Sequence, residues 1–166
     1  ARMDHPAFVV ERIVAPGVVE MSFRGGVMDV FFDGAPVTVH ESSGITRKAK
    51  LTGPSEVSSP MGKHYVAEVD GGTSGVNVGD VATWELPPAE IDAEGLVHTH
   101  ACDDLSALAA AVCAMDELLK RRLRGESMEP TRLFFTRAEE IGFIGAIAAC
   151  KLGTIPRGAR VIALEN

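Results

Sequence analysis

The sequence predicts an α/β fold, a partial sheet with covering helices, together with a small all-β domain of the barrel or sandwich type. Between about residues 17 and 94, short apolar segments alternate with turn signals roughly every ten residues, which is typical of small antiparallel domains. After Leu96 the pattern changes to one long segment with a 3.6-residue period. Two apolar segments of strand length follow, separated by a second helical pattern. This order predicts a parallel or mixed sheet covered by helices.

The amino-terminal half is predicted to consist of short strands. Pro16-Gly17 and Pro87-Pro88 end two of them, and Asp33-Gly34 is a hairpin signal between two others. Residues 42–60 are rich in Ser, Gly, Thr and Pro and predict an irregular segment with at most one short strand near residues 49–51. The predicted strands cover residues 7–14, 18–23, 27–32, 36–40, 64–69 and 81–86.

The carboxyl-terminal half is predicted to alternate between helices and strands. Apolar residues recur at helical spacing over residues 104–124, with Asp103 or Asp104 available to cap the start of the helix and basic residues near its end. A second helix, rich in Ala and Gly, is expected over residues 142–152. Parallel strands are expected at residues 132–136 and 159–164, and residues 96–100 are a further candidate strand.

Composition narrows the class of protein. The 166 residues suffice for one ordinary core or two small domains. The net charge of -7 disfavours nucleic acid as the main partner, and no apolar run reaches the ~18 residues that span a bilayer. Without such a run and without the pattern of a signal peptide at the start, a cytoplasmic protein is the default expectation. Three cysteines without CxxC spacing predict reduced, mostly packed thiols. The start without Met and the stop at the end of a predicted strand suggest a piece of a longer chain.

Acidic residues end successive predicted segments. Asp103-Asp104 precedes the long helix, Glu139-Glu140 follows an apolar strand, and Glu165 ends the last one. Taken alone, Glu139-Glu140 fits a solvated acidic corner. In parallel sheets, however, functional groups gather at the carboxyl ends of strands, and carboxylates are hard ligands for divalent ions. The pattern therefore favours a shared metal site.

Four short motifs occur in order along the chain. They are Ala1-Arg2-Met3-Asp4 with the strand after it, Ala101-Cys102-Asp103-Asp104, the segment from Ala138 to Ala146 that contains Glu139-Glu140, and Val161-Ile162-Ala163-Leu164-Glu165. In order and spacing, these motifs resemble those of the cocatalytic metallo-aminopeptidases, specifically the branch that forms tetrahedral particles and includes glutamyl and deblocking aminopeptidases.

The resemblance implies a site with two divalent metal ions, for which Zn, Co and Mn are the candidates. Asp103 would bridge the ions, Glu140 would bind one of them, and Glu165 would bind the other at a position where the family more often has Asp. Glu139 would be the general base that takes a proton from the metal-bound water, and Asp4 would orient the neighbouring ligand. Two ions that share one anion lower the pKa of a bridging water and polarise the scissile carbonyl.

The resemblance also implies activity and organisation. The expected reaction is removal of the N-terminal residue from a peptide by a homo-oligomer, a dimer or a larger particle. Residues 1–16 would begin the catalytic α/β domain, residues 17–94 would form an inserted barrel used in dimerisation, and residues 95–166 would continue the catalytic domain. The alternatives are a deacylase of N-acyl amino acids from the same clan, and a metal-free homologue or fragment that acts in assembly through the β domain.

Two departures from the family pattern limit this expectation. Arg2 stands where the family has a histidine ligand, and an arginine cannot bind a cation and competes with one through its fixed charge. His5 would point to the other face of a strand. No counterpart of the last histidine ligand precedes Asn166. The sequence therefore predicts an incomplete metal site and little or no peptidase activity.

Other candidate residues have plainer interpretations. His98 and His100 could bind zinc from one strand face but are expected to be polar residues near a strand end. Cys102 is expected to be a packed thiol, and His40 and His64 are expected at the surface. Gly142 and Gly145 are expected to let a helix lie close to the sheet. The basic run of residues 120–124 is expected to complement the carboxyl end of its helix.

Overall fold

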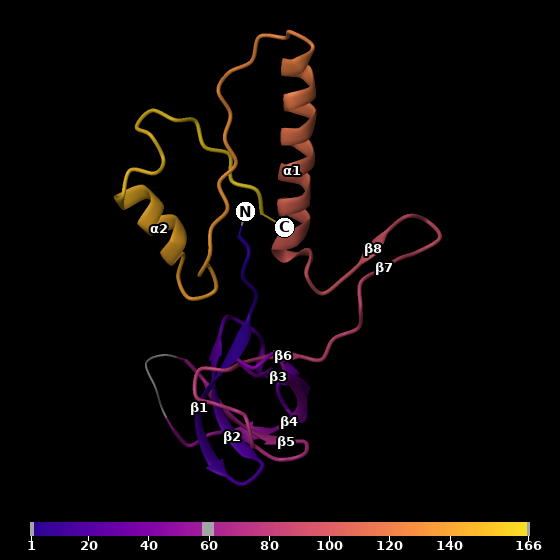
Figure 1. The fold of residues 1–166 in the computed structure, drawn as a ribbon, viewed down its shortest axis with the longest axis vertical. Helices are drawn as coiled ribbons and strands as arrows, with labels where there is room; N and C mark the ends of the chain where they lie inside the picture. The colour runs from indigo at the N-terminus through magenta and orange to yellow at the C-terminus, as the bar shows by residue number, and fades with distance from the viewer. Residues whose placement is uncertain (1, 58–61, 166) are drawn as a thin grey trace. The chain divides into compact units, whose positions relative to one another are not determined.

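The computed structural model describes residues 2–57 and 62–165, and the chain divides into two compact units (Figure 1). One unit joins Ala1–His5 to Pro87–Asn166, and the other consists of Pro6–Leu86. The predicted organisation placed its boundaries after residues 16 and 94. The compact units divide differently, because the first strand pairs on both edges with strands of the β unit.

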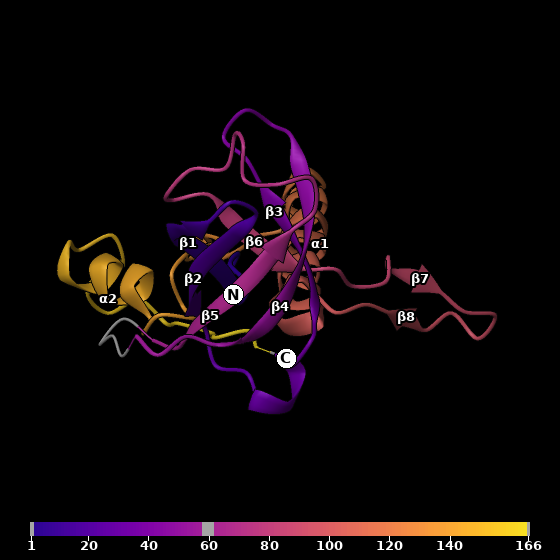
Figure 2. The same cartoon turned by 90° about the horizontal axis from the view of Figure 1, so that it is seen from below.

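The second unit is a closed antiparallel barrel. Its described strands run in the order β1-β2-β5-β4-β3-β6, and pairing of β1 with β6 closes the ring (Figure 2). Closure leaves no strand edge unpaired, which removes a site for aggregation. The bounds are β1 Ala7–Ala15, β2 Val18–Arg24, β3 Pro36–His40, β4 Thr46–Pro54, β5 His64–Val69 and β6 Val81–Trp84.

Inward-facing side chains from these strands form one core. Its centre is aromatic: Phe8 has ring contacts with Phe23, Phe32, Tyr65 and Trp84, and Phe32 stacks on Tyr65 with ring centroids 4.3 Å apart. Phe8 and most aliphatic members of the core are fully buried. The small barrel that the sequence predicts is therefore confirmed, with a filled interior.

Two details of the β unit differ from the sequence prediction. Residues 27–32 form no strand, and a 3₁₀ helix, η1 at Asp29–Phe31, lies there instead. The predicted hairpin across Asp33-Gly34 is therefore wrong, and β3 pairs with β4 and β6. The apolar pattern misleads because Met28, Val30 and Phe31 are exposed while Phe32 packs into the core. β4 is also longer than the short strand predicted near residues 49–51.

The other unit contains the helices. The predicted long helix is α1, Cys102–Leu123, and the predicted second helix is α2, Ile144–Lys151. Two-residue strands β7, Glu90–Ile91, and β8, Val97–His98, pair as a short hairpin. Neither Asp103 nor Asp104 caps α1, because its N-cap is Ala101 and no side chain bonds there. No described helix is both long and apolar enough to cross a membrane.

The predicted parallel strands are not formed within the described part of this unit. Residues 132–136 and 159–164 lack strand structure, and residues 96–100 contribute only β8. What is present is an isolated parallel bridge between Arg2 and Thr136. A buried parallel strand needs neighbours and covering helices. The apolar side chains of Phe134, Val161 and Ile162 remain exposed, and the buried apolar residues described in this unit are Ala107, Ala111 and Ala149.

Candidate functional site

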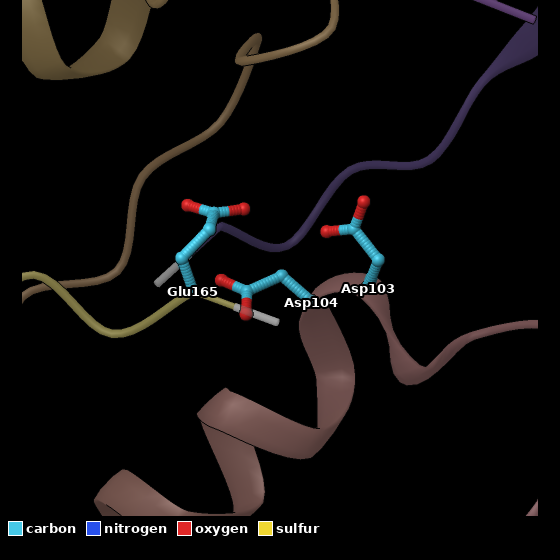
Figure 3. A group of neighbouring side chains, drawn as sticks. All are labelled: Asp103, Asp104 and Glu165. Carbon is cyan, nitrogen blue, oxygen red and sulfur yellow. The ribbon is translucent and has the colours of Figure 1, made fainter.

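The predicted site residues come together within the helical unit. Asp103 and Asp104 lie at the start of α1, where their backbone angles are not yet helical. Glu139 and Glu140 lie in the turn before α2, and Glu165 lies in the carboxyl-terminal segment. Figure 3 shows Asp103, Asp104 and Glu165 beside one another. Segments far apart in the sequence thus bring their carboxylates to one place.

Arg2 lies among these carboxylates and is 5% exposed. Its Nη1 contacts Glu140 Oε1 at 2.5 Å, and its Nη2 contacts Asp103 Oδ1 at 2.7 Å. Its Nε is 3.0 Å from Glu139 Oε2 in an ion pair that lacks hydrogen-bond geometry. Glu165 Oε1 lies further away, at 3.9 Å from Nε. The planar guanidinium therefore directs its nitrogens to carboxylates from three different segments.

The charge of Arg2 is fixed by this environment. Burial alone would lower the pKa of the guanidinium, but Glu140, Asp103 and Glu139 outweigh it, and the pKa of Arg2 is raised above its ordinary value. Arginine is already protonated throughout the physiological range. The site thus contains a positive charge throughout the physiological pH range.

The backbone of the amino-terminal segment is held in place as well. Arg2 N donates to Asp104 Oδ2 at 2.7 Å, and Met3 N donates to the carbonyl oxygen of Thr136 at 3.0 Å. Arg2 Nη1 also donates to the carbonyl oxygen of Asp4 at 2.8 Å. Since both the backbone and the side chain of Arg2 are anchored, the guanidinium is not free to swing away from the cluster.

A strained turn presents Glu139 and Glu140. The residues that flank it, Ala138 at φ 60° and Phe143 at φ 57°, adopt left-handed conformations that cost on the order of 1 kcal/mol each for residues with a Cβ. The turn is closed by Gly142 N and Phe143 N, which both donate to the carbonyl oxygen of Glu139. Strain of this kind persists where the surrounding structure requires a defined side-chain position.

Gly145 allows α2 to approach this turn. Its amide donates to the carbonyl oxygen of Arg137 at 3.1 Å, and a Cβ at this position would meet the Arg137 backbone. Gly142 instead has φ 106° and open space around it, so it serves the turn conformation. The expectation that a small residue permits close packing therefore holds for Gly145, with the turn as its neighbour in place of a sheet strand.

Asp4 lies beside the same turn, where its Oδ2 accepts a hydrogen bond from Glu140 N at 3.2 Å. Its other oxygen, Oδ1, is buried without a hydrogen-bond partner among the described residues. Asp4 therefore contacts the backbone of Glu140, and its carbonyl oxygen contacts Arg2, which stands where the resemblance implies the ligand that Asp4 would orient.

A divalent ion fits one part of the cluster. Asp103, Asp104 and Glu165 each offer one carboxylate oxygen, and these oxygens lie within 4.8 Å of one another. Asp104 is fully buried, and its Oδ1 has no hydrogen-bond partner among the described residues. An anionic oxygen that is buried and unpaired is costly unless a cation compensates it. This set of hard oxygens suits a divalent ion.

A second ion does not fit the side chains as they stand. The resemblance implies that Glu140 binds a metal and that Asp103 bridges two. In the structure both carboxylates pair with Arg2, as does Glu139. A divalent ion on this side would have to displace the guanidinium. The sequence signalled that Arg2 departs from the family pattern, but it could not show that Arg2 lies against the carboxylates of Asp103, Glu139 and Glu140.

The histidines considered as candidates lie outside the carboxylate cluster in ordinary polar surroundings. His98 Nε2 is 2.7 Å from Asp92 Oδ2, and His100 is exposed, as expected for polar residues near a strand end. His40 is exposed as predicted. His64 is not at the surface: it is buried beside Glu20, because β5 pairs with β2 there.

The cysteines are less packed than the sequence predicts. Cys102 is half-buried, whereas Cys113 and Cys150 are exposed, and all three are free thiols. The reason is the small core of the helical unit, where α1 buries Ala107 and Ala111 and leaves most of its other faces exposed. The basic run lies in the last turn of α1, as expected, and Lys120 also pairs with Asp116 at 2.6 Å.

Comparison with known proteins identifies the relatives of the chain. A family model described as M42 glutamyl aminopeptidase matches residues 1–152. No curated protein sequence matches.

Solved structures resemble the chain in fold. A TET aminopeptidase from the marine sediment archaeon Thaumarchaeota archaeon SCGC AB-539-E09 has a TM-score of 0.66 at 19% identity, over 91% of this chain and 45% of that one. Aminopeptidase APDkam598 from the archaeon Desulfurococcus kamchatkensis has a TM-score of 0.62 at 19% identity, over 92% and 44%. PhTET1-12s, described as a dodecamer in the asymmetric unit, has a TM-score of 0.60 at 23% identity, over 92% and 47%. The chain spans less than half the length of each.

Proposed function

Because the chain belongs to the M42 glutamyl aminopeptidase family, we propose that it forms part of a metal-dependent aminopeptidase that removes N-terminal residues from peptides. The observation that carries this proposal is the convergence of the predicted residues. Asp4, Asp103, Glu139, Glu140 and Glu165 come from separate segments and meet around Arg2 within one compact unit. A solvated acidic surface would not require a buried arginine at the centre of these carboxylates.

Asp103, Asp104 and Glu165 would hold a divalent ion, for which zinc, cobalt and manganese are the candidates. A divalent ion at such a site supplies Lewis acidity, which polarises a carbonyl and lowers the pKa of bound water. Buried Asp104 would fix the position of this set from the start of α1, and the more exposed Asp103 and Glu165 would face the substrate side.

Glu139 is proposed as the general base. Its side chain is 22% exposed, so its carboxylate is accessible and still held against Arg2 Nε. A carboxylate that does not bind the metal can accept a proton from the attacking water and return it to the leaving amine. Asp4 and the strained turn would keep the backbone of Glu140, and with it the neighbouring Glu139, in a fixed position.

A comparison of substrates tests this function. The sequence alone predicts little or no activity, but the gathered carboxylates lead us to expect that the manganese-loaded protein releases the amine from aminoacyl anilides with a free N-terminus and leaves N-acyl amino acids intact. Glu139→Gln keeps the shape of the side chain but removes the basic group, and we expect it to lower kcat by ~10²–10⁴-fold. Glu129→Gln, a matched change at an exposed residue of the same unit, should leave kcat unchanged.

The outcomes of this assay separate the alternatives. Cleavage of N-acyl amino acids without cleavage of anilides would replace the aminopeptidase by a deacylase. Equal activity of the Glu139→Gln variant and the parent would remove Glu139 from its proposed role.

A second candidate function is assembly through the barrel without chemistry. The presence of Arg2 as an internal cation favours it, since Arg2 neutralises carboxylates that would otherwise bind a metal.

We propose a homo-oligomer, a dimer or a larger particle, with the barrel as its contact domain, in line with the dodecamer named for one related structure. Light scattering after size-exclusion chromatography tests this, and a monomer at micromolar concentration would contradict it. The exposed free thiols support a cytoplasmic location.

A further inference from the structure

We propose that the Arg2 guanidinium is a built-in cation that replaces one divalent ion, so that the cluster keeps a single ion site formed by Asp103, Asp104 and Glu165. This inference rests on the proposed function in one respect, that the bound ion is a divalent metal. It differs from the two-ion site that the resemblance implies, and it gives Asp104 a direct part in binding.

The ion pairs of Arg2 differ from weak, solvent-exposed salt bridges. Surface ion pairs contribute little because water competes for both partners and the side chains are mobile. Here the side chain is 6% exposed, its Nη1 and Nη2 lie 2.5 and 2.7 Å from the oxygens of Glu140 and Asp103, and its own backbone amide is held by Asp104. The guanidinium is therefore a fixed part of the site.

The space for a second ion is taken by the same contacts. An ion shared by Asp103 and Glu140 would need the oxygens that face Nη2 and Nη1. It would also approach a positive charge that cannot be removed, because arginine does not lose its proton in proteins. Histidine, which the family has at this position, is neutral when it binds metal and adds a ligand instead of a charge.

One guanidinium leaves part of the cluster uncompensated. Asp104 Oδ1 is buried and has no hydrogen-bond partner among the described residues. One carboxylate oxygen each from Asp103, Asp104 and Glu165 lies within 4.8 Å of the other two. Glu165 is weakly paired with Arg2, at 3.9 Å. The negative charge that remains on this side has room for one hard cation.

Binding of Mn²⁺ tests the inference without any assay of activity. Mn²⁺ prefers oxygen ligands, so the exposed cysteines compete little for it. Equilibrium dialysis with elemental analysis should find about one Mn²⁺ per chain for the parent and about two for Arg2→His, where the charge is lost and a ligand is gained. Arg2→Lys keeps the charge and should bind one. Arg122→Met, which removes an exposed arginine of the same unit, should also bind one.

A further variant keeps the test decisive if Arg2→His does not fold. Asp104→Asn removes the buried anion, and the parent's single Mn²⁺ should then be lost, with at least a tenfold weaker apparent affinity. Two ions in the parent, none in the parent, unchanged binding in Asp104→Asn, or one ion in folded Arg2→His would each overturn the proposal. Its failure is distinct from that of the proposed function, which depends on hydrolysis of aminoacyl substrates and on Glu139.

Discussion

Glu20 is a buried carboxylate of the barrel that is surrounded by polar partners. Its Oε2 accepts hydrogen bonds from Arg12 Nη2 at 2.8 Å and Ser55 Oγ at 2.6 Å, and its Oε1 lies 3.2 Å from His64 Nδ1. The hydrogen bond from Arg12 is the largest influence, and with Ser55 and His64 it lowers the pKa of Glu20 to about 2. The charged form is thus favoured in the folded barrel.

This lowered pKa predicts the acid sensitivity of the barrel. The unfolded chain binds a proton at Glu20 near its ordinary pKa of about 4.3, whereas the folded protein does not until about pH 2. The contribution is therefore fully present above about pH 4.5 and is lost as the pH falls towards 2. Urea titrations between pH 2 and 7 should show it.

Glu20→Gln should lower the free energy of unfolding at pH 7 by about 1–3 kcal/mol relative to the parent. The free energy of unfolding of this variant should also depend less on pH between 2 and 7. Glu68→Gln, at an exposed position of β5, is the matched control and should keep the acid dependence of the parent. An unchanged pH profile in the Glu20 variant would contradict the assignment.

Single residues differ in how far the sequence reveals them. The motifs identified Asp103, Glu139, Glu140 and Glu165 by their spacing, and the structure brings them together around one cation. Burial was harder to predict, because polar residues are placed inside only by pairs formed across the fold. His64 is buried by its position opposite β2, and no local pattern distinguishes it from an exposed histidine.

At the scale of elements, α2 and the turn before it form one device for placing Glu139 and Glu140. Gly145→Ala would put a Cβ 2.9 Å from Arg137 N and closer still to the carbonyl oxygen of Arg137. We expect overpacking to cost about 1–3 kcal/mol of unfolding free energy and to weaken Mn²⁺ binding less than it lowers kcat, since the turn carries the proposed base. Thermal melts and kinetics measure the two effects.

Cys150→Ala provides the comparison for this prediction, because it changes an exposed residue of the same helix. It should melt with the parent and keep its kcat. If Gly145→Ala were as stable and as active as Cys150→Ala, the close approach of α2 to the turn would not matter for the site.

The elements that the sequence predicts best are those whose own residues carry a clear hydrophobic period. Strands β3 and β5 have the bounds that the alternation predicts, and α1 follows the helical period. Residues 27–32 show why other predictions failed. They are apolar at every position except Asp29, yet only Phe32 is buried, because its ring packs against Phe8 on β1 and Tyr65 on β5.

At the scale of the whole molecule, the core is unevenly distributed between the two compact units. The barrel contains the aromatic cluster and the large buried aliphatic residues, whereas the helical unit buries mainly alanines among its described residues. A closed sheet with its own core should fold alone. We expect residues 6–86, produced separately, to unfold in one cooperative transition.

Circular dichroism and hydrogen exchange of that fragment measure this directly. Slowly exchanging amides should map to β1 through β6, and residues 87–166 alone should lack a cooperative transition because they bury little apolar surface. A fragment of residues 6–86 without protected amides would show that the barrel depends on the other unit.

The sequence also predicted a sheet for the helical unit, and the described residues contain only its beginning, the bridge from Arg2 to Thr136. An apolar segment indicates that its residues prefer burial, but it does not show which strands will pair. A parallel sheet forms only where partner strands and covering helices are present. The predicted strand ends nevertheless meet, since side-chain pairing to Arg2 gathers the carboxylates there. For this site, charge complementarity was more predictive than strand geometry.

The central claim is that Arg2 acts as a resident cation beside a single metal site. A crystal structure of the protein grown with Mn²⁺ tests it most directly, through the anomalous signal of the metal. We predict one anomalous peak, bound by Asp103, Asp104 and Glu165, with the guanidinium still against Asp103, Glu139 and Glu140. Two peaks, with Arg2 displaced from those carboxylates, would contradict the claim.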